Sequence, residues 1–257
     1  MAISSTHYFL IRNLFEHGLL PQNGALLQIG EANWYDLDPS SMADDIRRLV
    51  GDACRRDALL ERLAQAIADK RPYYLFEIAR VFYELFFSPA EMQAVDFNGT
   101  PTAHRLDLNA PLALSRRFDV VINHGTAEHI FNIAQVFKTM HDYTVPGGVM
   151  LHEGPFTGWI DHGFYNLQPT LFFDLAESNR YRLLGLFIED LTARTVQQIH
   201  AREDVYELAK AKQIPDNSVL FAVLLKDAQE SPFRIPIQGY YGRSLTDSGM
   251  AAWQELR

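Results

Sequence analysis

Hydrophobic residues along the chain alternate between short continuous runs and longer stretches with helical spacing. The short runs predict seven strands, at residues 25–29, 92–97, 104–108, 118–123, 148–152, 181–188 and 219–225. The fourth and seventh of these runs are almost wholly apolar, which is typical of strands covered on both faces. The stretches between them predict helices, at residues 41–50, 57–69, 72–87, 127–143, 169–179 and 202–213.

This alternation of strands and helices favours an α/β fold with a mostly parallel sheet. We predict a single domain over residues 1–257. About sixty residues separate the first two strands, although a plain crossover needs only one helix. We therefore expect a helical insert at residues 34–90, which could cap the site, form a subunit contact or be an inert insertion. Residues 231–257 form a C-terminal tail whose two early prolines predict an extended start.

Composition and charge restrict the class of protein. The 257 residues are 47% hydrophobic and 21% charged, which is ordinary for a globular protein. The net charge of −9, without a block of Lys and Arg, argues against nucleic-acid binding. Cys54 is the single cysteine, so an intrachain disulfide is excluded. We expect a cytoplasmic protein, because we find neither a signal peptide nor an apolar stretch long enough to span a membrane.

Ligands of open α/β sheets bind beyond the carboxyl ends of the strands, so the residues that follow each predicted strand are the first candidates. Gly30 follows the first strand and allows close approach of a ligand to the backbone. Asp96 ends the second strand and could accept hydrogen bonds from ribose hydroxyls, and Asp107 could accept one from an amine. Tight turns with solvated carboxylates explain the same residues without a ligand.

The densest polar cluster of the chain is at residues 123–129. Thr126 could cap the helix that follows, which places Glu128 and His129 in its first turn. A histidine at a helix N-terminus tends to stay neutral, so His129 could act as a base. Capping together with a buried, hydrogen-bonded histidine is the alternative.

A long loop rich in glycine and aromatic residues follows the fifth strand, at residues 154–166. Its polar and aromatic side chains could form a substrate wall, with the residues Trp159, His162, Tyr165 and Asn166. His152 ends the strand itself and adds a further candidate contact with the substrate. The alternative is a loop that packs on its own aromatic rings.

The histidines and the carboxylate of this region also raise the question of a metal site. The sequence contains no HExxH motif, and Glu128 and His129 are adjacent rather than four residues apart. Adjacent residues of an α-helix point about 100° apart. We therefore expect no bound metal.

The chain resembles the class I S-adenosylmethionine-dependent methyltransferases over roughly residues 22 to 226. The resemblance rests on LLQIG at 26–30, VDF at 95–97, FDVVIN at 118–123 and the PGG turn at 146–148. The family's first loop usually reads DxGxGxG, whereas this chain keeps only Gly30 and has Gln28 within the strand.

The resemblance implies a seven-stranded, mostly parallel Rossmann-like sheet flanked by helices, whose last two strands form an antiparallel hairpin. It implies S-adenosyl-L-methionine as cofactor, with Gly30 beside its methionine and ribose parts, Asp96 at the ribose and Asp107 near the adenine. The full set of implied cofactor residues is Gly30, Glu31, Asp96, Phe97, Asp107, Leu108, Asn123, His124 and Gly125.

These expectations combine into a methyltransferase that acts on a small molecule by SN2 transfer with a histidine base. The catalytic candidates are Glu128, His129 and His162, with His129 as the base, and the substrate candidates are His152, Trp159, Tyr165 and Asn166. The alternatives are a non-methylating enzyme, or an inactive scaffold or partner subunit, on the same fold. We expect a small-molecule substrate as partner and neither nucleic acid nor membrane. A homodimer could form through the helical insert, and the sequence leaves open whether residues 7–20 close over the cofactor.

Overall fold

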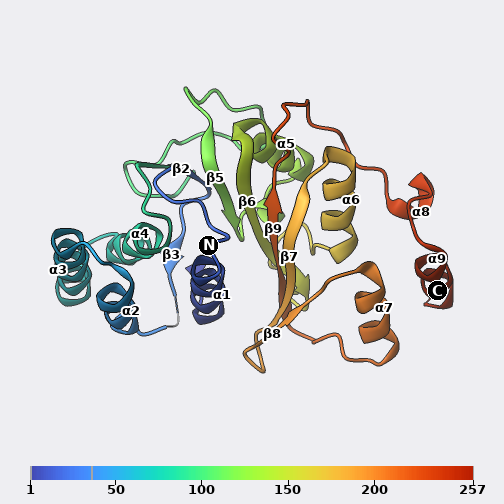
Figure 1. The fold of residues 1–257 in the computed structure, drawn as a ribbon, viewed down its shortest axis with the longest axis horizontal. Coiled ribbons are helices and arrows are strands. Elements are labelled where there is room, and N and C mark those ends of the chain that lie inside the picture. Colours follow the sequence, from blue (N-terminus) through green and yellow to red (C-terminus); the bar gives the residue numbers. More distant parts are fainter. Residues whose placement is uncertain (1, 36, 257) are drawn as a thin grey trace.

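The structure is a computed structural model that describes residues 2–35 and 37–256. Its centre is a seven-stranded sheet with the strand order β4-β2-β5-β6-β9-β7-β8 (Figure 1). The strands are β2 (Ala25–Ile29), β4 (Glu91–Val95), β5 (Phe118–His124), β6 (Thr144–Thr157), β7 (Arg182–Asp190), β8 (Thr195–Gln198) and β9 (Ser218–Leu225). A two-residue pair of strands, β1 (Ala2–Ile3) and β3 (Asn33–Trp34), lies apart from it.

The sheet is mostly parallel, as predicted. Strands β4, β2, β5 and β6 pair in parallel, whereas β9 runs antiparallel to both of its neighbours, β6 and β7. The last two strands of the sequence analysis are β7 and β9, and their antiparallel pairing is confirmed. The α/β, Rossmann-like architecture expected from the sequence is therefore present.

One predicted strand was wrong, and one strand of the sheet was missed. Residues 104–108 form no strand, because only an isolated bridge between Val95 and His104 joins this segment to β4. The sheet still has seven strands, because it contains β8, which was not predicted and which pairs with the end of β7. The predicted helix at 127–143 is also divided, into a 3-10 turn, η1 (Ala127–His129), and the helix α5 (Ile133–Tyr143).

Helices cover both faces of the sheet, which explains why its central strands are apolar throughout. Along β2, Leu26 belongs to the core under α1 and α4, whereas Leu27 belongs to the core under α5 and α6. The helices are α1 (Ser5–Glu16), α2 (Ser41–Leu49), α3 (Ala53–Asp69), α4 (Tyr74–Phe87), α5 (Ile133–Tyr143), α6 (Pro169–Asn179), α7 (Arg202–Lys210), α8 (Gly239–Gly242) and α9 (Asp247–Glu255). Among the described residues, none of these helices is long and apolar enough to cross a membrane.

The region between β2 and β4 holds three helices, α2, α3 and α4, on the left in Figure 1. Helix α4 is the crossover helix, and none of its residues is exposed, because α1, α2, α3 and β3 all pack against it. Only one turn of the chain, residues 88–90, then leads into β4.

The C-terminal tail packs on its own chain. Asn179 at the end of α6 donates a hydrogen bond to the carbonyl of Arg234 and accepts one from the amide of that residue. Further along, the ring of Tyr240 stacks on Trp253 with centroids 3.9 Å apart, and Lys210 of α7 pairs with Glu255 of α9. The segment from 231 to 238 has no regular secondary structure, and the short helices α8 and α9 follow it (Figure 1).

Candidate active site

A cavity of about 430 Å³ opens at the carboxyl ends of β5, β6 and β7, and the first turn of α1 closes one side of it. This edge of an open α/β sheet is the one at which ligands bind. The ionisable residues of its wall are His7, His124, Glu128, His129, Glu153, His162, Glu189 and Arg194. Tyr35, Trp159, Leu191 and Val219 add aromatic and apolar surface.

Glu128 lies on the turn η1 with its side chain only 3% exposed. The carboxylate sits in a slot between two glycines: a Cβ on Gly125 would lie 3.3 Å from Oε1, and one on Gly154 would lie 3.8 Å from Oε2. Oε2 has no hydrogen-bond partner. Burial, with a smaller contribution from the nearby Glu153, raises the pKa of Glu128 to about 8. Glu128 is therefore mainly protonated at neutral pH and can donate a hydrogen bond into the cavity.

His129 turns back toward its chain neighbour. Its Nε2 lies 3.8 Å from Oε1 of Glu128, so the divergence expected for adjacent helical residues does not occur in this 3-10 turn. Burial lowers the pKa of His129, which keeps its imidazole neutral at pH 7. The ring of His162 approaches it with centroids 4.8 Å apart. The structure thus brings together the three predicted catalytic residues, Glu128, His129 and His162.

A second pair of histidines forms the floor of the cavity. The rings of His7 and His124 stack with centroids 4.9 Å apart, although the two residues belong to α1 and β5. His7 is held from two sides, because its Nδ1 lies 3.1 Å from Ser4 Oγ and its Nε2 lies 3.1 Å from Glu153 Oε2. His124 Nδ1 lies 3.2 Å from the hydroxyl of Tyr83, while its buried Nε2 has no partner. Burial lowers the pKa of His124 well below its usual value, so the ring is neutral.

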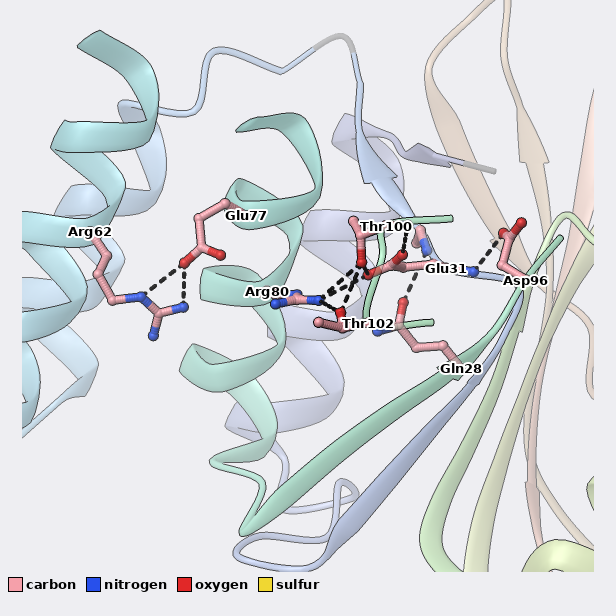
Figure 2. A network of polar contacts seen from close by, with 9 residues as sticks. Gln28, Glu31, Arg62, Glu77, Arg80, Asp96, Thr100 and Thr102 are labelled. Carbon is pink, nitrogen blue, oxygen red and sulfur yellow. Dashed lines mark hydrogen bonds and ion pairs between the residues drawn. The ribbon is translucent and has the colours of Figure 1, made fainter. Parts of the chain in front are cut away.

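The predicted cofactor loop, which follows β2, is tied to the loop that follows β4 (Figure 2). Gly30 has a φ of +80°, which favours glycine, and its amide donates to the carbonyl of Val95. The amide of Glu31 donates to Oδ2 of Asp96 over 2.9 Å, and the amide of Asn98 donates to Oδ1 over 2.7 Å. Each oxygen of Asp96 thus accepts one backbone hydrogen bond.

The side chain of Glu31 is used within the protein. It is buried, and it accepts hydrogen bonds from the amide of Thr100 (2.6 Å) and from the hydroxyl of the same residue (3.0 Å). Arg80 of α4 completes the network with an ion pair of 3.1 Å to Glu31 and a hydrogen bond of 2.6 Å to Thr102 (Figure 2). As long as these hydrogen bonds and the ion pair persist, Glu31 can contact a ligand only through its backbone.

The other predicted cofactor residues fall into two groups. Phe97 is 54% exposed beside Asp96, and Asp107 is exposed with its carboxylate bound to Asn109. Leu108 and Asn123 are buried. Asn123 stabilises the end of β5, because its Oδ1 accepts hydrogen bonds from the amides of residues 126 and 127 and its Nδ2 donates to the carbonyl of Glu153.

The predicted helix cap at Thr126 was wrong, because this residue makes no side-chain capping hydrogen bond. Its hydroxyl instead donates to the carbonyl of Ile29 at the end of β2, over 2.7 Å. The bond ties η1 to the first strand of the predicted cofactor site.

Of the four predicted substrate residues, one lines the cavity and three do not. Trp159 lines the cavity, and its ring meets His162 edge-on at a centroid distance of 4.6 Å. His152 points to the opposite face of the sheet, where it packs against Phe137 and Phe172. Tyr165 and Asn166 donate to the carbonyls of residues 131 and 158, and they lie outside the cavity wall.

Sequence reasoning gave no role to several residues of the wall, above all His7, Glu153 and Glu189. A signal for two of them exists in the sequence, because Glu153 and Glu189 interrupt or end otherwise apolar strands. Charged groups are rarely buried without a partner or a function. For His7 no such signal exists, because only the fold brings it to Glu153.

No family model and no curated protein matches the chain. Solved structures similar to it include an S-adenosylmethionine-dependent methyltransferase from Mesorhizobium loti (13% identity, TM-score 0.46, 87% of this chain and 99% of that one). They also include the O-methyltransferase of a trans-AT PKS multienzyme of Brevibacillus brevis in complex with S-adenosyl-L-homocysteine (12% identity, TM-score 0.39, 97% of this chain and 82% of that one). A third is the [4+2]-cyclase SpnF (13% identity, TM-score 0.44, 87% of this chain and 82% of that one).

Likeness at these identities concerns the fold alone. The sheet of this chain itself has the mostly parallel arrangement, with an antiparallel strand β9, that the sequence led us to expect. Any proposal about the activity and the cofactor must therefore rest on the residues of this chain.

Proposed function

We propose that the chain is a methyltransferase that uses S-adenosyl-L-methionine and modifies a small molecule. The observation that supports this most is the continuous edge formed by the ends of β4, β2, β5 and β6, which lie side by side in the sheet. Neighbouring strands are about 4.8 Å apart, so this edge spans roughly 14 Å from Asp96 to the cavity. An extended cofactor held at Asp96 would present its reactive end at the cavity.

The residues at the β4 end of this edge fit a ribose. A carboxylate oxygen can accept two hydrogen bonds, and each oxygen of Asp96 accepts only one from the backbone. The half-buried Asp96 therefore keeps one acceptor position on each oxygen, which suits two neighbouring hydroxyls. Phe97 offers an exposed ring beside it, and Gly30 has no side chain to obstruct the adjoining part of the cofactor.

The cavity fits an acceptor of small size, because ligand pockets usually measure roughly 300–1,000 Å³. The bound cofactor supplies an activated methyl group on a sulfonium. The protein must then place the acceptor atom in line with that group and remove its proton. Neutral His129 accepts this proton, protonated Glu128 donates a hydrogen bond that orients the acceptor, and His162 and Trp159 form the outer wall.

Calorimetric titration of the protein with S-adenosylmethionine and S-adenosylhomocysteine tests the proposal. We expect micromolar binding that Asp96→Ala weakens at least ten-fold. Asp227→Ala is the matched control: this carboxylate also accepts a hydrogen bond from the amide of the second residue after it. It follows β9, which is antiparallel to β6, so it lies at the opposite edge of the sheet. The control variant should bind like the unmodified protein.

Folded protein that binds neither compound would overturn the proposal. A non-methylating enzyme, or an inactive partner subunit, would then explain the fold better. Equal binding by Asp96→Ala and the unmodified protein would place the cofactor elsewhere on the sheet edge.

A further inference from the structure

We propose that Glu128, His129 and His162 form a binding site for one divalent transition-metal ion of the Zn²⁺ class. The three side chains each offer a ligand atom, and these atoms all lie within 4.8 Å of one another. Two of the residues are on the turn η1, and the third is on the loop that follows β6. The adjacency of Glu128 and His129 argued against such a site in the sequence, but the 3-10 turn lets both side chains face the same point.

Glu128 provides a second, independent observation. Its side chain is 97% buried, being only 3% exposed, and Oε2 has no hydrogen-bond partner. A buried polar atom without a partner is costly, so native proteins seldom keep one without a use. The slot between Gly125 and Gly154 leaves the carboxylate no bulky neighbour at these two positions. A cation at the cavity wall would give this oxygen its missing partner.

The loop that carries His162 is docked onto η1. The amide of Phe164 donates to the carbonyl of Glu128 over 2.8 Å. Gly163 permits this approach, because a Cβ there would lie 2.9 Å from that carbonyl oxygen and 3.2 Å from His129 Nδ1. The ring of Trp159 also packs edge-on against His162. The site is thus built by specific contacts rather than by chance proximity of surface side chains.

Two imidazoles and one carboxylate define the class of ion. This ligand set suits Zn²⁺, Fe²⁺ or Co²⁺, whereas Mg²⁺ and Ca²⁺ prefer oxygen ligands alone. Bonds of about 2.0–2.2 Å place neighbouring ligand atoms roughly 3.3 Å apart, so binding needs movements of about 1 Å. His129 and His162 are exposed enough to make them. Three protein ligands leave a position open toward the cavity, as in catalytic zinc sites.

The metal site is inferred independently of methyl transfer, but it uses the same histidine. A coordinated imidazole nitrogen cannot also accept a proton. A bound ion therefore removes the base proposed above, and we expect Zn²⁺ to inhibit methyl transfer. The binding test below contains neither cofactor nor acceptor, so its failure leaves the proposed function untouched, and the converse also holds.

The experiment uses full-length, tag-free protein that has been stripped with a chelator. Zn²⁺ is titrated by calorimetry, and Co²⁺ is titrated with its visible absorption as the readout. We expect one ion per chain with micromolar or tighter affinity. Glu128→Gln and His162→Ala should each weaken binding at least ten-fold. His200→Ala is the matched control, because His200 is also exposed but lies outside the cluster.

The proposal is overturned if the stripped protein binds no ion, or if Glu128→Gln and His162→Ala bind as tightly as His200→Ala. Thermal unfolding of every variant shows whether it is folded. Glu128→Gln should fold, because Gln resembles the protonated acid in size and in hydrogen bonding. His162→Ala changes an exposed side chain, so it provides the test if the buried variant unfolds.

Discussion

His7 Nε2 lies 3.1 Å from Glu153 Oε2, and this contact joins the first turn of α1 to the end of β6. Both side chains are largely buried, at 2% and 12% exposure. Ser4 holds the other nitrogen of the same ring, and the ring stacks on His124. The N-terminal helix is thereby fixed over the cavity, so it forms a wall of the site as well as part of the core.

His7→Ala tests the importance of this wall for stability. The substitution leaves Glu153 without its partner and removes the stacking on His124, so the free energy of unfolding should fall by about 2 kcal/mol. Urea unfolding followed by circular dichroism measures the change. His17→Ala, at the exposed end of the same helix, should change the midpoint little. Equal midpoints for the two variants would show that the contact does not hold α1 in place.

Arg80→Ala tests the network that closes the loop after β2. Glu31 is 3% exposed, and the substitution leaves its carboxylate with hydrogen bonds from Thr100 alone. We expect a loss of about 2 kcal/mol in unfolding free energy, most of which the second substitution Glu31→Gln should restore. Arg71→Ala removes a pair in which the arginine is 74% exposed, and it should cost much less. An additive double variant would mean that the buried pair is not coupled.

The central strands were predicted well from the sequence, because strands that are buried on both faces consist of nearly continuous apolar runs. Sequence reasoning missed β8 because all four residues of that strand are exposed, so no hydrophobic pattern marks them. It wrongly predicted a strand at 104–108, where Leu108 is buried without a partner strand. A hydrophobic pattern predicts that side chains are buried, but it does not predict that the backbone pairs with a neighbouring strand.

The candidate site was predicted where a single local segment supplies it. Glu128 and His129 stand out in the sequence because they follow a buried strand, at the position where α/β folds bind ligands. His152 was a reasonable candidate by the same rule, but strand residues alternate between faces, and its register turns it toward Phe137. The contacts of His7 join segments more than a hundred residues apart, and only the three-dimensional fold reveals them.

Gly163→Ala tests whether close packing positions the loop that carries His162. The added Cβ would lie 2.9 Å from the carbonyl oxygen of Glu128, so the loop must move away from η1. The hydrogen bond from the Phe164 amide to that oxygen should weaken, and hydrogen exchange at this amide should become at least ten-fold faster. Gly51→Ala, where a Cβ meets no atom within 4 Å, is the control. Unchanged exchange at Phe164 would contradict the packing argument.

The buried His152 should make the free energy of unfolding depend on pH. Complete burial lowers its pKa to about 3, against about 6.5 in an unfolded chain. The folded protein therefore binds fewer protons than the unfolded chain between these values. The contribution of neutral His152 is fully present above pH 6.5 and is lost as the pH falls toward 3. At pH 4 the loss should be roughly 3 kcal/mol relative to pH 8.

His152→Leu isolates this effect from other acid-titrating groups, because leucine suits the apolar contacts with Phe137 and Phe172 and cannot take up a proton. Unfolding free energies of both proteins are measured by urea denaturation from pH 4 to pH 8. The variant should lose less stability toward low pH, so the difference between the two proteins should grow in its favour as the pH falls below 6.5. Parallel curves would mean that His152 takes up its proton equally easily in the folded and unfolded chains, which complete burial between two aromatic rings argues against.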